Sequence, residues 1–502
     1  MKTMKSAVYR ASGAATAFLR SAFDRAVSLR ESWMPGSNPD LSWVNSGLRT
    51  AAVCMIGRIC SFVKSAAVSI VWRTTRSNQR KPSLKNHLAL LSVLLSTLAA
   101  CSGGGGAGVG AGSDAGAPPA ATANPTAAGF FTQSGKVFDA SGQEIQIRGI
   151  NHFGFNNPNL RPEQLWRMGW KEQIAQMKSL GFNAIRLLFV PDTLYSTTPI
   201  VNGPGKIFID ENLNPELIGK TPLQVLDLWM AEADRQGMYV LLNFYSVSMQ
   251  TQYPTWFLSN PADFNLTYNQ QAYTRENWAR DLAFVAQRYA NLSHFLGLDL
   301  YNEPHDVIRW SAGDANVTNP VYFWKEAAEF AAAAVLAANP KLLIFVEGSN
   351  GNYDGIENSN LSMNWGENFQ PEAYKPLNIP ADKLVLTPHS YGPDAFMKTS
   401  FSAANFPANL PADWDTLFGQ FTPAHAVVIG EFGGYYGTGP TGQMDVTWQN
   451  AFVQYLLGKG LRNSFYWCYT PNSGGTGGIL DDSLNVRQDK MALLRTLWGT
   501  GQ

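Results

Sequence analysis

The sequence predicts an α/β fold, a (β/α)8 TIM barrel preceded by a short N-terminal β-hairpin. From about residue 130 onward, short apolar stretches alternate with longer stretches of helical periodicity. Eight of the apolar stretches have the length and composition of strands buried on both faces, as in a parallel sheet. Two of them end in a glutamate, and enzymes with this fold place their reactive groups where the barrel strands end.

The expected hairpin pairs Phe131–Phe138 with Glu144–Arg148 across the turn-forming residues 139–143, and it would plug the floor of the barrel. The eight barrel strands are expected at Ile150–Phe153, Ala184–Val190, Tyr239–Phe244, Phe295–Tyr301, Leu342–Val346, Leu384–His389, Val427–Ile429 and Ser464–Cys468. Helices are expected at Gln164–Leu180, Pro222–Gln236, Ala272–Asn291, Pro320–Ala338, Asp445–Lys459 and Arg487–Leu497. A doubly wound open sheet is the alternative architecture. No glycine-rich nucleotide motif follows the first strand, so a nucleotide site is not indicated.

Three regions differ in composition: a leader at 1–101, a linker at 102–128 and a catalytic domain at 129–502. Residues 1–85 hold 14 Lys and Arg but 3 Asp and Glu, a net charge of +11. Leu88–Ala100 is an apolar run of 13 residues, too short to span a bilayer and typical of the core of a signal peptide. Because signal peptides start near the N-terminus, either the leader has two parts or residues 1–70 precede the true start. The segment 51–72 is a weak membrane candidate.

The leader ends Leu98-Ala99-Ala100-Cys101, which resembles the lipobox of bacterial lipoproteins. The resemblance implies cleavage before Cys101 and a lipid on its sulfur. Ser102 in the next position implies export to the outer membrane. The alternative is ordinary secretion with a chance cysteine. Gly, Ala, Ser, Pro and Thr dominate 102–128, which therefore suits a flexible tether.

The domain that follows is acidic. The whole chain has 38 Lys and Arg and 38 Asp and Glu, so the part outside the basic leader carries −11, which argues against binding to nucleic acid. Of the four cysteines, only Cys468 falls after residue 128, so this domain has no internal disulfide. Cys468 is expected to be a small buried strand residue rather than a nucleophile.

The two strand-end glutamates carry the chemistry. Glu303 follows Phe295–Tyr301 in Asn302-Glu303-Pro304, and Glu431 follows the run that ends at Ile429. Paired carboxyl groups are what the cleavage of a glycosidic bond needs, since one protonates the leaving oxygen and the other attacks the sugar. An ionised Glu431 would raise the pKa of Glu303, which would then keep a proton that it can donate as general acid.

Seven motifs resemble, in their order, glycoside hydrolase family 5, the cellulase family, and most closely its bacterial endoglucanase branch. They are Gly149–Gly154, Asn183–Leu187, Asn302–Pro304, Phe345–Gly348, His389–Tyr391, Gly430–Gly433 and Tyr466–Trp467. The resemblance covers about 145–480. It implies endo-acting, retaining hydrolysis of β-1,4-glucan by a monomer, with Glu303 as acid/base and Glu431 as nucleophile.

The resemblance also implies supporting roles. Asn302 would donate to the sugar 2-hydroxyl, Arg186 and Tyr391 would hold the nucleophile ionised and aligned, His389 would line the cleavage subsite, and Trp467 would lie under the sugar ring.

Three tryptophans are expected in loops over the barrel mouth. Trp365 resembles a residue of a glycone-side subsite, whereas Trp256 and Trp310 are equally compatible with packing. Glu347 also ends a strand and is expected to make a structural hydrogen bond.

Two positions depart from the family pattern. Tyr245 stands where relatives commonly have a histidine, and His152 stands where they often have an aromatic residue. Both are expected to bind substrate, and both leave the subsite preference open. Mannan, xylan or mixed-linkage glucan are alternative substrates. A non-catalytic polysaccharide-binding lipoprotein would need a lost carboxylate, and both Glu303 and Glu431 are present. The aromatic residues expected at the barrel mouth argue against a vestigial envelope scaffold. With six histidines and no metal-binding motif, no cofactor or catalytic metal is expected, and a structural Ca²⁺ is left open.

Overall fold

The computed structural model describes residues 129–200, 209–249, 252–258, 273–311, 319–349 and 361–500. The predicted leader, its lipidation residue Cys101 and the linker lie outside these ranges. None of the helices in the described ranges is long and apolar enough to cross a membrane.

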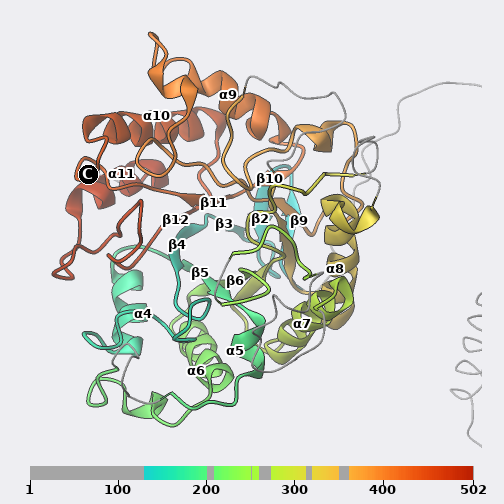
Figure 1. Ribbon diagram of the computed structural model, residues 1–502, viewed down its shortest axis with the longest axis vertical. Coiled ribbons are helices and arrows are strands. Elements are labelled where there is room, and N and C mark those ends of the chain that lie inside the picture. Colours follow the sequence, from blue (N-terminus) through green and yellow to red (C-terminus); the bar gives the residue numbers. More distant parts are fainter. Residues whose placement is uncertain are drawn as a thin grey trace, which may run out of the picture. The chain divides into compact units, whose positions relative to one another are not determined.

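Parallel strands form a closed barrel, as the sequence predicts, and not an open sheet (Figure 1). The strands are β4 (Arg148–His152), β5 (Ala184–Phe189), β6 (Tyr239–Phe244), β7 (Phe295–Asp299), β8 (Leu343–Val346), β9 (Leu384–Leu386), β10 (Ala426–Val427), β11 (Ile429–Phe432) and β12 (Ser464–Tyr466). β10 pairs with β9 and β11 pairs with β12. β10 and β11 are the two halves of one strand that is interrupted at Val428, so the barrel has eight strands.

The N-terminal segment folds as three short antiparallel strands rather than two. They are β1 (Phe131–Gln133), β2 (Lys136–Phe138) and β3 (Glu144–Ile145). The predicted strand Phe131–Phe138 is itself a hairpin. Ser134 and Gly135, with φ of 49° and 76°, make its two-residue turn. Two consecutive positive φ angles are the geometry of a tight hairpin turn, which glycine favours.

This hairpin covers the floor of the barrel. Phe130, Val137 and Ile145 join one apolar cluster with inward-facing strand residues such as Leu296 and Val385. The Phe130 amide donates to the Lys341 carbonyl at 2.9 Å, which ties the segment to the lower end of a barrel strand.

Helices surround the strands in Figure 1. They are α4 (Trp170–Ser179), α5 (Pro191–Tyr195), α6 (Pro222–Arg235), α7 (Arg275–Arg288), α8 (Trp324–Ala338), α9 (Leu410–Leu417), α10 (Gln443–Lys459) and α11 (Gln488–Trp498). Single 3₁₀ turns occur at Pro215–Leu217, Pro320–Tyr322, Gln370–Ala373, Thr399–Ser402 and Gly419–Phe421. The starts of α6 and α7 are set by capping boxes, in which Thr221 pairs with Gln224 and Thr274 with Asn277.

Three helices differ from the prediction for physical reasons. The expected helix Gln164–Leu180 begins only at Trp170, whose amide donates to the side chain of Asn214. Gln164 has a φ of 64°, which a helix does not allow. α5 and α9 are too short to show a helical period in the sequence.

Candidate active site

Most of the predicted site residues converge at the C-terminal ends of the barrel strands; His152 is the exception. Glu303 lies four residues beyond the end of β7, Glu347 directly follows β8, and Glu431 lies within β11. A bridge between His389 and Glu431 brings the segment after β9 alongside β11. The fold thus gathers at one mouth side chains that are far apart in the sequence.

Arg186, on β5, is the centre of the site and is fully buried. Its Nη1 lies 2.5 Å from Glu431 Oε1 and donates to Asn151 Oδ1 at 3.0 Å. Its Nη2 donates to Asn302 Oδ1 at 2.9 Å. The same guanidinium reaches Asp299 from Nε at 2.8 Å and Glu347 from Nη2 at 3.1 Å. Its planar fork of donors therefore fixes five side chains at once.

The two predicted catalytic glutamates lie close together. A carboxylate oxygen of Glu303, one of Glu431 and a ring nitrogen of His389 all lie within 4.8 Å of one another. His389 Nδ1 lies 3.0 Å from Glu303 Oε1 and 3.6 Å from Glu431 Oε2. An approach this close is compatible with a carboxyl pair that acts through a covalent intermediate, whose two groups lie about 5–5.5 Å apart.

The surroundings of the two carboxyl groups differ. Glu431 is ion-paired with Arg186 and accepts a hydrogen bond from the Tyr391 hydroxyl. Glu303 accepts from Gln252 Nε2 at 2.9 Å and contacts His389. Side-chain exposure is 14% for Glu303 and 5% for Glu431, so the former is more open to exchange a proton with its surroundings.

Burial dominates the protonation of the site. It raises the pKa of Glu303, which Gln252 opposes by donating to the carboxylate, so the rise comes from burial more than from the charge of Glu431. Burial also raises the pKa of Glu431, opposed by His389 and Arg186. Burial lowers the pKa of His389 to about 4, so its ring is neutral at ordinary pH. Burial raises the pKa of Tyr391, which therefore keeps its proton to donate.

Tyr245 acts through a neighbour. Its hydroxyl donates to Gln252 Oε1 at 3.0 Å, and the same amide donates from Nε2 to Glu303 Oε2. The Tyr245 hydroxyl thus sets which end of the amide faces Glu303. The residue that departs from the family pattern is the start of a two-step hydrogen-bond chain to that carboxyl.

Two of the predicted aromatic platforms are partly exposed. Trp467, which follows β12, stacks with Phe153 at a centroid distance of 5.9 Å, and its Nε1 donates to Ser473 Oγ. Trp365 is 40% exposed and stacks on the His305 ring at 3.7 Å and 10°. His305 lies two residues after Glu303, which puts Trp365 beside the acid/base candidate.

His152 lies elsewhere. It is fully buried, with Nε2 2.7 Å from Gln173 Oε1 and Nδ1 3.0 Å from the Phe153 carbonyl. Its ring packs against Trp229 and Tyr469. Neighbouring residues of a strand point to opposite faces. Asn151 faces the barrel interior and Arg186, whereas His152 faces the surrounding helices, and we therefore leave His152 out of the site.

The sequence reasoning did not assign roles to Asn151, Asp299 or Gln252. For the first two, the sequence contained a usable indication. Asn151 is the neighbour of His152 in the strand, so one of the two must face the barrel interior. Asp299 is a charged residue inside an otherwise apolar strand, and a buried charge needs a partner. Gln252 is in a loop and had no such signal.

Trp256, Trp310 and Cys468, which were also considered as site residues, take no part in the site. Trp256 and Trp310 are buried packing residues. Cys468 is a buried free cysteine, and burial raises the pKa of its thiol to about 12, so a thiolate nucleophile is disfavoured.

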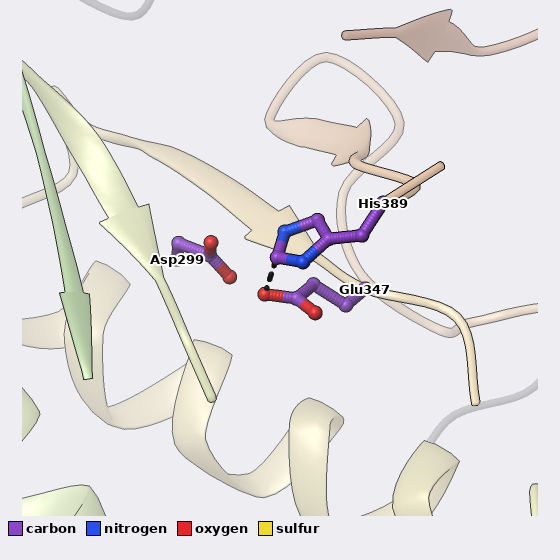
Figure 2. Close-up of side chains that lie close together, drawn as sticks. All are labelled: Asp299, Glu347 and His389. Atoms are coloured by element: carbon purple, nitrogen blue, oxygen red, sulfur yellow. Dashed lines mark ion pairs between the residues drawn. The ribbon is translucent and has the colours of Figure 1, made fainter. Parts of the chain in front are cut away.

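Asp299, Glu347 and His389 form a second close group (Figure 2). Their ligand atoms lie within 4.8 Å of one another, a spacing that a metal ion could use. However, Arg186 already bridges Asp299 and Glu347 with its own positive charge. The donor set therefore favours an arginine-centred network over a metal ion.

Several known proteins are similar to this chain in sequence and fold. The family profile described as Cellulase (glycosyl hydrolase family 5) matches residues 138–473, more than half of the chain. The major extracellular endoglucanase of Xanthomonas campestris pv. campestris is 46% identical, over 76% of this chain and 73% of that protein. An endoglucanase of Paenibacillus polymyxa is 34% identical, over 73% of this chain and 86% of that protein.

Solved structures agree. The catalytic domain of the Xanthomonas enzyme is 45% identical with a TM-score of 0.67, over 74% of this chain and 99% of the other. A cellotetraose complex of an endocellulase variant from Pyrococcus horikoshii is 33% identical with a TM-score of 0.66, over 74% of this chain and 99% of the other. Sequence, fold and the converging carboxyl groups lead to one conclusion: this chain belongs to the cellulase family, glycosyl hydrolase family 5.

Proposed function

We propose that the protein cuts internal β-1,4 bonds of cellulose-type glucan with retention of configuration, with Glu303 as acid/base and Glu431 as nucleophile. The enzyme is an endo-β-1,4-glucanase, a hydrolase of O-glycosyl bonds. The observation that supports the roles is the pair of carboxyl groups with oxygens within 4.8 Å of each other, both close to Nδ1 of the neutral His389.

The two roles follow from the contacts of each carboxyl group. A nucleophile must be ionised and held still, and Glu431 has both the Arg186 ion pair and the Tyr391 hydroxyl. An acid must hold a proton and release it, and Glu303 has neutral donors in place of a direct ion pair and is the more exposed of the two. Burial raises the pKa of both groups, so the contacts and not the pKa direction distinguish them.

The reaction then runs in two displacements. Glu431 attacks the anomeric carbon, the bond to the leaving oxygen breaks, and Glu303 gives that oxygen its proton. In the second displacement Glu303 takes a proton from water, whose oxygen attacks the anomeric carbon, and Glu431 leaves as a carboxylate. Arg186 also holds the side-chain oxygen of Asn302, which leaves the Asn302 amide nitrogen to donate to the sugar 2-hydroxyl.

The substrate is proposed to lie across Trp467 and Trp365. Flat aromatic faces pack against sugar rings with much apolar contact and little loss of entropy. The cellotetraose complex of the Pyrococcus relative supports a cello-oligosaccharide ligand. Hydrolysis rates on carboxymethylcellulose, mannan, xylan and mixed-linkage glucan, measured side by side, test this preference. A higher rate on mannan or xylan would overturn it.

Separate substitutions test the two roles. Glu431→Gln should abolish hydrolysis of every substrate alike. Glu303→Ala should lose hydrolysis of the polymer by several orders of magnitude, but it should still attack a dinitrophenyl cellobioside, whose leaving group needs no proton. Azide should then restore turnover and yield a β-glycosyl azide. Equal loss on both substrates without azide rescue would contradict the role of Glu303.

We also propose that the mature enzyme is exported as a monomer and carries a lipid at Cys101. The support is the lipobox-like Leu98–Cys101 and the extracellular location in the name of the Xanthomonas relative. Cys101→Ser should abolish incorporation of labelled palmitate and release the protein from the membrane fraction. A wild-type protein that takes up no label would refute the lipid.

A further inference from the structure

A buried ion pair joins the two loops that follow β8 and β9. Lys398 Nζ lies 2.7 Å from Glu367 Oε2, and both side chains are buried. The stretch before Lys398 stays at the surface, where Phe396 and Met397 are exposed. Lysine and glutamate are rarely buried unless they are paired, because each loses its hydration. The pair therefore fastens the end of this exposed stretch to the loop that contains Glu367.

The Glu367 carboxylate is connected to Tyr391 by two routes. Its Oε1 accepts a hydrogen bond from the hydroxyl of Ser390, the residue before Tyr391, at 2.6 Å. Its Oε2 accepts from the Asn364 amide at 2.7 Å, and Asn364 Oδ1 accepts from the Tyr391 amide at 3.0 Å. The Tyr391 hydroxyl in turn donates to Glu431. The backbone that aims this hydroxyl is thus held on two sides by one buried carboxylate.

The segment Asn364–Glu367 also carries the Trp365 platform. A Cβ on Gly366 would lie 2.5 Å from Glu347 Oε2, and Gly366 has a φ of 72°. Only glycine allows so close an approach at that angle, so the segment packs directly against the site. The hydrogen bond from the Asn364 amide to the Glu367 carboxylate closes the segment around Trp365. The platform and the Tyr391 donor therefore share one anchor.

We propose that Glu367 and Lys398 form a positioning pair for the active site. The pair holds Trp365, on which the sugar is proposed to lie, and Tyr391, which donates to the nucleophile. The inference rests on the proposed role of Glu431 as that nucleophile. Without Lys398 the buried charge of Glu367 loses its partner, and both segments that it anchors loosen. Orientation of the nucleophile and binding of the sugar then weaken together.

Single-turnover release of dinitrophenol from dinitrophenyl cellobioside measures the attack by the nucleophile. The leaving group needs no proton, so the rate does not depend on the acid. Lys398→Met should lower this rate about 10- to 100-fold, the cost of a misplaced reacting group. Adding Glu367→Gln removes the unpaired charge but keeps an oxygen for the Asn364 amide, and it should restore the rate to within about threefold of the wild type. A double variant as slow as Lys398→Met would contradict an ion pair that acts by balancing charge.

Two double-mutant cycles separate positioning from stability. If the pair acts through the Tyr391 hydroxyl, Lys398→Met should lower the single-turnover rate by no more than about threefold in the Tyr391→Phe background. If it also holds the platform, Lys398→Met should raise the KM for cellotetraose several-fold in the wild-type background and leave it unchanged beside Trp365→Ala. Full additivity in either cycle would overturn the proposal.

Lys383 provides a matched control. It is also a buried lysine, but it lies at the barrel floor, where its Nζ donates to the Phe130 carbonyl at 2.6 Å. Lys383→Met should lower the free energy of unfolding, measured in urea, and leave the single-turnover rate and the KM for cellotetraose unchanged. If it slows the reaction as much as Lys398→Met does, the loss reports general stability, and the positioning pair is contradicted.

Ser390→Ala keeps the ion pair and removes only the hydroxyl that donates to Glu367. If Lys398→Met does not fold, this variant takes its place in the cycle with Tyr391→Phe, where a smaller loss of rate should again disappear. The proposed function is tested separately by the anomeric form of the product. A β-configured product together with additive cycles would remove the pair and leave the function standing. An α-configured product would overturn the function, and with it the nucleophile that the pair positions.

Discussion

Arg186 Nη1 lies 2.5 Å from Glu431 Oε1, and both side chains are buried. The same guanidinium holds Asn302, the neighbour of Glu303 in the chain. One side chain thus contacts the proposed nucleophile and the residue beside the proposed acid. Their relative position depends on a rigid fork of donors and not on loop conformation.

Tyr391→Phe should lower kcat. The change removes only the hydroxyl that donates to Glu431 Oε2. A hydrogen bond to a charged group contributes about 1.5–3 kcal/mol, so we expect a loss of about 10- to 150-fold, with little change in KM. Steady-state kinetics on a soluble cello-oligosaccharide measure it. An unchanged kcat would show that Arg186 alone orients the nucleophile.

Gln252→Leu should move the alkaline limb of the pH profile upward. Gln252 donates to the Glu303 carboxylate and so favours its ionised form, which lowers the pKa of Glu303. Without that donor the pKa of Glu303 rises further, and the acid stays protonated to a higher pH. The profile of kcat/KM against pH reports this group in the free enzyme.

The matched variant is Tyr245→Phe. It keeps Gln252 but removes the hydroxyl that orients its amide. A smaller shift in the same direction is expected. A shift to lower pH in either variant would mean that the amide stabilises the protonated form of Glu303.

Trp365→Ala should weaken the binding of long substrates. The ring is 40% exposed and rests on His305 beside Glu303. Loss of a stacking platform of about 1.5 kcal/mol raises KM for cellotetraose about tenfold. Tyr374 is 66% exposed and is not one of the residues that build the site described above, so Tyr374→Ala is the control and should leave KM unchanged. Equal effects of the two variants would remove Trp365 from the substrate path.

A chain beginning at Ala128 should fold and work alone. The fold starts with the floor hairpin, which Phe130 ties to Lys341. We expect the kcat of the full chain and one cooperative unfolding transition in urea. A chain beginning at Asp139 lacks Phe130 and Val137 and should lose several kcal/mol, at about 1.5–3 kcal/mol for each buried side chain. Non-cooperative unfolding of the longer chain would place the domain boundary elsewhere.

The sequence predicted the barrel because both of its signals are local. Short apolar runs mark strands buried on two faces, and capping residues such as Thr221 and Thr274 mark helix starts. The split of β10 from β11 at Val428 and the turn at Ser134 depend on pairing partners far along the chain, which no local pattern contains.

Sequence patterns located the site residues that lie at or near strand ends. They did not reveal the residues that contribute only through a neighbouring side chain. Glu303, Glu431 and Arg186 converge as expected. Gln252 reaches Glu303 from a loop, and Asp299 works through Arg186, so neither shows its role in sequence. The prediction that His152 binds substrate was wrong about the face of the strand. Neighbouring strand residues point to opposite faces, and Asn151, one residue earlier, is the one that faces the barrel interior.

The anomeric form of the first product tests the central claim most directly. Wild-type enzyme acting on cellotetraose, followed by proton NMR before mutarotation, should release β-configured reducing ends. That result requires two displacements at carboxyl groups as close as Glu303 and Glu431. Release of the α-anomer first would mean an inverting site, and it would contradict the assignment of Glu431 as nucleophile.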